Sequence, residues 1–186
     1  MVRVILRRRA PRNRLRRLLL GGAAVAAGAA VTRRRLDAGS FVSRRRLRDA
    51  LQPHAGERLL ELGPGSGHYA ERAADWVWPG GRLDLVGAAE AELEPALART
   101  RDLGLDNVVP AAAGDVLPWP DATFDGAYSV AAGAELLARD GMLDELHRVI
   151  RPGGRLVVAD RSLRAPAEAA GFRVDRRSLL VARFAR

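Results

Sequence analysis

The residues best suited to chemistry lie in one stretch of the sequence, RLLELGPGSGHYAERAADW at positions 58–76. Glu61 stands two places before the first of three alternating glycines, Gly63, Gly65 and Gly67. Because glycines permit a sharp turn and carry no side chain, a ligand can lie directly on the main chain there. The helix expected next would direct free N–H groups toward that ligand, and Glu61 would add a negative charge. The stretch therefore indicates a site for a small molecule with both anionic and cationic groups.

Further residues are candidate proton acceptors, namely His68, Tyr128, Glu135 and Asp160. Glu135 and Asp160 follow predicted parallel strands, and ligands in such sheets bind at the carboxyl ends of the strands. His68 fits equally well as a water-exposed residue of the first helical turn. The three histidines lack metal-ligand spacing, and the absence of cysteine excludes disulfides, thiolate zinc sites and cysteine nucleophiles. We therefore expect no metal site, and the identity of a catalytic residue stays open.

The elements that must position these residues alternate between strands and helices. An apolar run containing Leu59, Leu60 and Leu62 predicts the first strand. The other expected strands are 82–86, 108–112, 124–130, 155–159, 172–175 and 178–185. The expected helices are 44–51, one that follows the glycines, 91–103, 142–150 and a short one near 166–170. This order predicts an α/β fold with a doubly wound, mostly parallel sheet and an antiparallel pair of C-terminal strands.

Length and charge divide the chain into an arm and a domain. The 186 residues with 48% apolar content fit one folded domain, which we expect at residues 40–186. All 31 basic residues are arginine, and fifteen of them lie within residues 1–48 beside a single acid, Asp37. The basic character therefore belongs mainly to an arm at residues 1–39.

The arm contains an uncharged run, 18–31, which is shorter than the roughly 20 residues that a membrane-spanning helix needs. A basic segment before such a run also fits a secretory signal, and a solvated, arginine-rich leader is a further alternative. We favour a helix on a membrane surface or on the domain itself, with residues 1–35 drawn to anionic lipid. The expected location is cytoplasmic, with membrane association through residues 1–35. Nucleic acid is a less favoured partner, and the oligomeric state is open.

Three sequence motifs occur in order across the domain. They are the acid and alternating glycines at 61–67, GDVLPWP at 114–120 followed by FD at 124–125, and RVIRPGGRL at 148–156. Together they resemble the motifs of class I S-adenosylmethionine-dependent methyltransferases. A dinucleotide-binding fingerprint would instead need a third glycine where His68 stands. The resemblance implies a seven-stranded, Rossmann-like methyltransferase sheet with S-adenosyl-L-methionine as the cofactor.

The resemblance also implies roles for individual residues. The residues that would hold the methionine part of the cofactor are Glu61, Gly63, Gly65 and Gly67. Asp115 and the Val116 backbone would meet the adenine, because a carboxylate can accept from its exocyclic amine and an N–H can donate to a ring nitrogen. An apolar neighbour such as Leu117 would cover the ring. The alternative for Asp115 is an acid that caps a turn.

One position departs from the pattern of the family. An acid that binds both ribose hydroxyls usually ends the second strand, and here Gly87 stands there, with Glu90 three residues on as a candidate substitute. Charge-assisted hydrogen bonds contribute about 1.5 to 3 kcal/mol, so we hypothesise a weakened or reorganised cofactor site. The short path from Asp160 to Pro166 further predicts an acceptor pocket that is open or covered by the arm.

The sequence thus predicts an S-adenosylmethionine-dependent methyltransferase that acts on a small-molecule or lipid-like acceptor. Such an enzyme works mainly by holding the acceptor in line, about 3 to 3.5 Å from the methyl carbon. The alternative is a non-catalytic binding or scaffold protein of the same fold, suggested by Gly87. A membrane-surface or nucleic-acid protein directed by the arm ranks third. No residue identifies the methyl acceptor.

Overall fold

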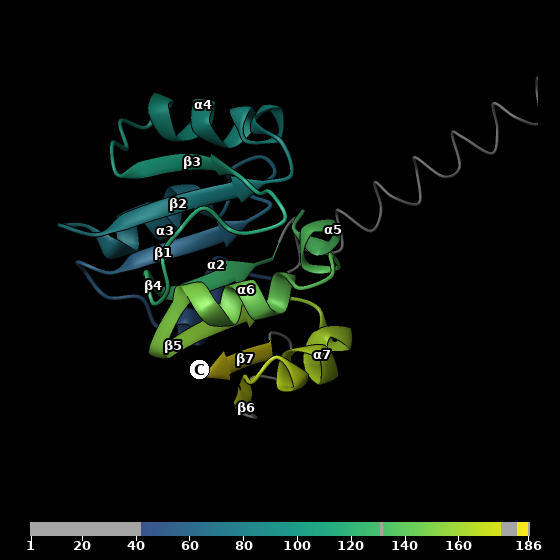
Figure 1. Cartoon of the computed structure of the whole chain (residues 1–186). Coiled ribbons are helices and arrows are strands. Elements are labelled where there is room, and N and C mark those ends of the chain that lie inside the picture. The colour runs from purple at the N-terminus through teal and green to yellow at the C-terminus, as the bar shows by residue number, and fades with distance from the viewer. Residues whose placement is uncertain (1–41, 131, 176–181, 186) are drawn as a thin grey trace, which may run out of the picture. The chain divides into compact units, whose positions relative to one another are not determined.

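The computed structural model describes residues 42–130, 132–175 and 182–185, and a single sheet forms the centre of this part of the chain (Figure 1). Its strands are β1 Arg58–Leu62, β2 Arg82–Gly87, β3 Val108–Ala112, β4 Phe124–Ser129, β5 Ile150–Val158, β6 Arg173–Asp175 and β7 Ala182–Ala185. They pair in the order β3-β2-β1-β4-β5-β7-β6. β1 to β5 are parallel, whereas β7 pairs antiparallel with both β5 and β6. The predicted doubly wound, mostly parallel α/β sheet is confirmed.

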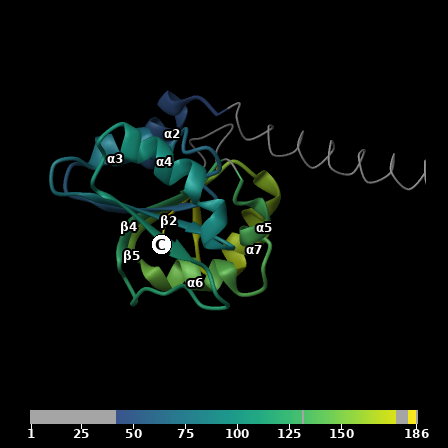
Figure 2. The ribbon, with the colours of Figure 1, turned by 90° about the horizontal axis from the view of Figure 1, so that it is seen from above.

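Helices cover both faces of this sheet (Figure 2). The helical segments are α2 Arg44–Leu51, α3 Ala70–Val77, η2 Glu90–Glu92, α4 Glu94–Asp102, α5 Ala134–Leu137, α6 Met142–Val149, η3 Arg161–Leu163 and α7 Arg164–Ala169. One apolar cluster lies under α2, α3 and α4, and a second lies under α5, α6 and α7. Because side chains alternate along a strand, Leu59 of β1 joins the first cluster while Leu60 and Leu62 join the second.

Local sequence explains where the helices begin. The Ser43 side chain accepts the N–H of Arg46 and caps α2. Pro95 lies in the first turn of α4, where its missing N–H removes no helical hydrogen bond. None of the helices within residues 42–185 that the structure describes is long and apolar enough to cross a membrane. The predicted arm at residues 1–39 lies outside the described residues, so its boundary with the domain stays a prediction.

The structure corrects three details of the predicted elements. The helix expected at 91–103 is divided into η2 and α4, because Pro95 favours a helix start at that point. β5 begins at Ile150 and not at Arg155, since a register shift against β4 accommodates the Pro-Gly-Gly segment within the strand. The sequence does not predict α5, because four residues are too few to show a helical period.

Buried charges at the amino ends of the strands are fully paired. Asp84 on β2 is buried, and its carboxylate accepts hydrogen bonds from Arg58 Nε at 2.8 Å and Arg82 Nη2 at 2.6 Å. Arg155 on β5 is buried as well and forms an ion pair with Glu57. Arg155 also donates to the carbonyl oxygens of Leu51, Gln52 and Asp125. These contacts fix the end of α2 to the sheet, at the edge opposite the glycine turn.

Candidate functional site

The glycine turn joins β1 to α3, and each of its three glycines has a positive φ: 63° at Gly63, 54° at Gly65 and 75° at Gly67. Two of the three are also required by packing. A Cβ on Gly63 would lie 2.3 Å from the backbone nitrogen of Gly133, and one on Gly67 would lie 2.8 Å from Ala96 Cα. Close approach of the chain to itself therefore explains much of the glycine pattern, and evidence for a ligand must come from the side chains nearby.

Glu61 supplies that evidence. It is buried on β1, and its Oε2 accepts a hydrogen bond from the Tyr128 hydroxyl at 2.9 Å. Its other oxygen, Oε1, is buried without a hydrogen-bond partner. Burial raises the pKa of Glu61 to about 8, although the bond from Tyr128 acts in the opposite direction. A buried carboxylate of this kind is stabilised when a hydrogen-bond donor or a cation comes into contact with it. Glu61 is therefore suited to the cationic amino-acid end of S-adenosylmethionine.

Tyr128 was predicted as a proton acceptor, and the structure gives it another role. The side chain is fully buried on β4, and burial together with the neighbouring Glu61 raises the pKa of the phenol well above its usual 10. Its hydroxyl donates to Glu61 and thereby holds that carboxylate in place. On the next residue, the Ser129 hydroxyl donates to Leu62 O at 3.1 Å and ties β4 to the end of β1.

His68 is held by an arginine that the sequence did not single out. Arg44 on α2 donates from Nε to His68 O at 3.2 Å, and its Nη2 lies 3.0 Å from His68 Nδ1. Arginine has no acceptor, so Nδ1 must accept and the ring proton must lie on Nε2. Burial, followed by the charge of Arg44, lowers the pKa of His68. The imidazole is therefore neutral at pH 7 with its acceptor nitrogen occupied, which argues against a role as general base.

Asp115 and Val116 follow β3 at the carboxyl edge of the sheet, and both are exposed. Val116 is 61% exposed, which is unusual for a large apolar side chain and suits a surface that covers a ring. Leu117, predicted to cover the adenine, is instead buried in the core beneath α6. α6 fixes this segment, because Glu145 accepts the Leu117 N–H at 2.9 Å and Arg148 donates to Leu117 O at 3.0 Å. Of these two neighbouring apolar side chains, Val116 is therefore the one that lies at the surface.

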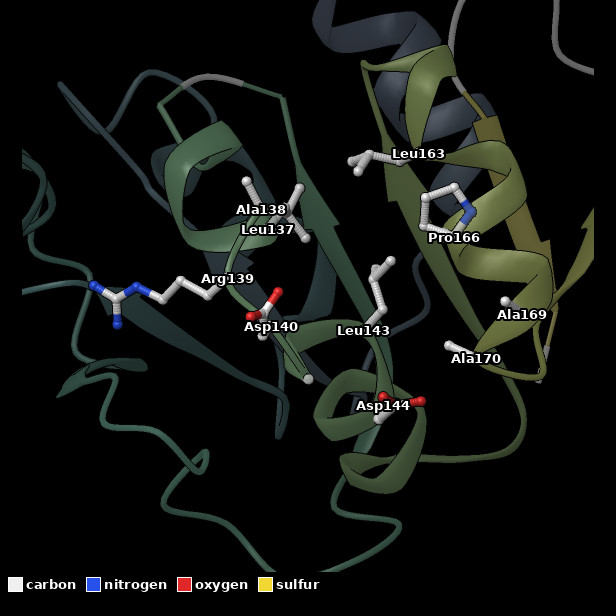
Figure 3. Close-up of a pocket in the computed structure, with 11 residues that line it drawn as sticks. Leu137, Ala138, Arg139, Asp140, Leu143, Asp144, Leu163, Pro166, Ala169 and Ala170 are labelled. Carbon is white, nitrogen blue, oxygen red and sulfur yellow. The ribbon is translucent and has the colours of Figure 1, made fainter.

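Glu135 and Asp160 are both exposed and follow β4 and β5, as expected. Asp160 accepts hydrogen bonds from the backbone and hydroxyl of Ser162, so it caps the turn into η3. Close to these segments, α5, α6 and α7 surround a hollow of about 380 Å³ (Figure 3). Leu143, Leu163 and Pro166 border it, while Arg139 extends away from it. The hollow is large enough for part of a small molecule, and its lining combines apolar side chains with the carboxylates of Asp140 and Asp144.

Comparison with known proteins identifies the class. Residues 60–158, more than half of the chain, match the family described as Methyltransferase domain. Sequence motifs, sheet order and site agree with that match. The chain therefore belongs to the class I S-adenosylmethionine-dependent methyltransferases, which confirms the predicted family and S-adenosyl-L-methionine as the cofactor.

Curated relatives include methyltransferases whose names refer to a sterol and to quinones. The 24-methylenesterol C-methyltransferase 2 of Oryza sativa subsp. japonica is 34% identical over 118 residues, covering 62% of this chain and 32% of the relative. The ubiquinone/menaquinone biosynthesis C-methyltransferase UbiE of Pasteurella multocida is 32% identical over 110 residues, covering 58% and 41%. A SAM-dependent methyltransferase structure from Aquifex aeolicus has a TM-score of 0.63 at 20% identity, covering 76% of this chain and 87% of that one. The chain spans less than half of the length of these curated relatives. At 20% identity, the likeness to the solved structure shows the fold alone.

Proposed function

We propose that this chain is a catalytically competent methyltransferase whose acceptor is a small apolar or lipid-like molecule. The observation that carries the proposal is the buried Glu61 carboxylate, whose Oε1 has no partner directly before the glycine turn. Most buried side-chain oxygens in folded proteins have a hydrogen-bond partner, so Glu61 Oε1 is a candidate to receive a donor from a ligand. The names of the relatives, which refer to a sterol and to quinones, support an apolar acceptor.

The mechanism assigns simple tasks to the residues of the chain. When bound, S-adenosylmethionine supplies a methyl group on a sulfonium that carries its own leaving group. Glu61, oriented by Tyr128, would hold the cationic end of the cofactor, and Asp115 with Val116 would receive the adenine. Rate enhancement would then come from orientation of the two reactants and exclusion of water.

The acceptor occupies the hollow between α5, α6 and α7, where apolar side chains cover its non-reacting part and the carboxylates of Asp140 and Asp144 lie beside it. Glu135 and Asp160 are the predicted proton acceptors that remain, since Tyr128 and His68 are committed to other contacts. Both carboxylates are exposed to water, and Asp160 also caps the turn into η3. We therefore infer an acceptor atom that is already nucleophilic or readily deprotonated.

Binding and turnover test this function separately. Calorimetric titration of the full chain with S-adenosylmethionine and S-adenosylhomocysteine should show saturable binding of both. Radiolabelled methyl groups should then appear in a lipid or quinone fraction of a cell extract. Binding without transfer to any fraction would favour the alternative, a non-catalytic binding or scaffold protein. Failure to bind at millimolar concentrations would contradict both.

We also propose that the protein is cytoplasmic and associates with anionic membranes through residues 1–35. Support comes from the arginines of that segment and from a basic and aromatic surface on the domain. On this surface Arg45 is 92% exposed, Trp78 is 58% exposed, and the Arg48 guanidinium lies 6.0 Å from the Trp76 ring centroid. Arginine and tryptophan together are suited to the headgroup region of a bilayer.

Sedimentation with vesicles tests the membrane proposal. The full chain should bind phosphatidylglycerol vesicles more tightly than phosphatidylcholine vesicles, and salt should weaken the binding. Removal of residues 1–35 should abolish most of it, and Trp78→Ala should reduce the remainder. Tighter binding to duplex DNA than to the anionic vesicles would instead make nucleic acid the partner.

A further inference from the structure

The carboxyl end of β2 lacks the acid expected from the resemblance, yet a carboxylate lies there. Gly87, the last residue of β2, is buried. A Cβ built on it would lie 3.0 Å from Leu93 Cδ2 and 3.3 Å from Glu92 Oε2. The strand end therefore faces the side-chain oxygen of a residue five positions further along the chain.

A tight turn brings Glu92 back to the strand. Glu92 ends η2, whose backbone is closed by bonds from Glu92 N to Ala89 O at 3.1 Å and from Leu93 N to Glu90 O at 2.9 Å. Leu93 is fully buried in the cluster beneath α2, α3 and α4, which anchors the turn. Glu92 Oε2 then accepts the N–H of Ala88 at 3.0 Å. The carboxylate is thus held at the end of β2 by a hydrogen bond.

The order of the strands indicates which part of the cofactor would reach this carboxylate. β2 lies between β1 and β3 in the sheet. Glu61 is on β1 and Asp115 follows β3, so a ligand that extends from Glu61 to Asp115 must cross the end of β2. In S-adenosylmethionine, the ribose joins the amino-acid end to the adenine. The ribose hydroxyls would therefore lie over the end of β2.

We propose that Glu92 supplies the carboxylate that binds the ribose hydroxyls, in place of an acid at the end of the strand. A carboxylate has two oxygens and about four acceptor positions, of which the Ala88 N–H occupies one. The remaining positions can accept from the two neighbouring hydroxyls. The inference rests on S-adenosylmethionine as the cofactor and replaces Glu90, the candidate expected from the sequence. Glu90 contributes none of the three atoms closest to the Cβ position of Gly87.

The same geometry predicts that the effect of a substitution at residue 87 on ligand affinity depends on the side chain at residue 92. Gly87→Asp would place a second carboxylate beside Glu92, and two like charges at this distance oppose each other. The single variant should therefore bind no better than the natural chain. When Glu92→Gln is combined with it, the new aspartate can take over the hydroxyls and affinity should return. Such reciprocity would not arise if Glu92 only capped the turn.

Calorimetry with S-adenosylhomocysteine on the full chain tests the inference. Glu92→Gln should weaken binding by about tenfold or more, while the matched control Glu90→Gln should bind like the natural chain. A 2′-deoxy analogue of the ligand lacks one hydroxyl, so Glu92→Gln should lose clearly less affinity for it. Both glutamates are exposed, and thermal unfolding should confirm that each variant is folded.

The outcomes separate this inference from the cofactor assignment. Equal affinity of Glu92→Gln and the natural chain would overturn the role of Glu92 while leaving the cofactor intact. An equal loss for the ligand and its deoxy analogue would show that Glu92 acts on the turn alone, and would also overturn it. Absence of binding by the natural chain would remove both the inference and the proposed function.

Discussion

Buried acids at the two ends of the parallel strands, the amino edge and the carboxyl edge of the sheet, differ in how completely they are paired. At the amino edge, Asp84 meets two arginines. Toward the carboxyl edge, Glu61 meets a single tyrosine, and among the side chains that the structure describes its Oε1 is the buried polar atom left without a partner. Most buried polar atoms in folded proteins are paired, so the unpaired oxygen of Glu61 contrasts with the fully paired carboxylate of Asp84. The paired acid at the amino ends of the strands stabilises the fold, whereas the proposed cofactor site lies at their carboxyl ends.

The largest expected effect concerns Arg155 at the amino edge. Arg155→Met should lower the free energy of unfolding by about 3–5 kcal/mol, because Glu57 and three carbonyl oxygens lose their buried donor. Arg151→Met is the matched control, since Arg151 is half exposed and pairs with Asp125 at 2.7 Å. The control should cost less than about 1 kcal/mol in urea titrations. Equal losses would mean that burial at this edge does not decide stability.

The next effect contrasts the two acids directly. Glu61→Gln should weaken binding of S-adenosylhomocysteine by about tenfold or more, because an amide cannot become the anion that pairs with the amino group of the ligand. It should cause no loss of stability, because Glu61 Oε1 has no hydrogen-bond partner to lose and the raised pKa already keeps the carboxyl largely protonated at pH 7. Asp84→Asn should do the reverse and lower the free energy of unfolding by about 1.5 to 3 kcal/mol while ligand affinity is retained. Urea unfolding and calorimetry on both variants measure the contrast. A stability loss in Glu61→Gln as large as that in Asp84→Asn would contradict it.

Glu61 also predicts a pH dependence of stability. Its pKa rises from an ordinary 4.5 to about 8 in the folded chain, so the folded state keeps a proton that the unfolded state has released. The contribution of protonated Glu61 to the free energy of unfolding is fully present below about pH 4.5 and is lost as the pH rises through 8. The stability of Glu61→Gln relative to the natural chain should therefore increase from pH 5 to pH 8. Urea titrations across this range measure the difference, and a constant difference would contradict the raised pKa.

The smallest effect concerns Val116. Val116→Ser should change stability by less than about 0.5 kcal/mol, because the side chain is exposed. Binding should weaken several-fold, since partial burial of a valine contributes about 1 kcal/mol. Leu103→Ser is the control, because Leu103 is 57% exposed and follows α4. Similar affinities for both variants in calorimetry would remove Val116 from the adenine site.

The sequence predicts the order of strands and helices well, because apolar runs and glycine or proline breaks are local signals. It also singles out Glu61, whose position before the glycines is visible in one segment. Its partner Tyr128 lies 67 residues away, so their hydrogen bond depends on the pairing of β1 with β4. The expectation that Leu117 covers the adenine is wrong, because packing against α6 directs its side chain into the core. The approach of Glu92 to Gly87 likewise depends on a turn that Leu93 anchors in the core.

Helix α2 contacts both the amino edge of the sheet and the glycine turn at the carboxyl edge. Its carboxyl end is held by Arg155 through the carbonyl oxygen of Leu51, and its amino end holds the glycine turn through Arg44 and His68. This arrangement defines how far the chain can be shortened. A chain without residues 1–35 keeps both sets of hydrogen bonds. A chain that begins after residue 51 lacks both, and its solubility and its affinity for the ligand should therefore both decrease.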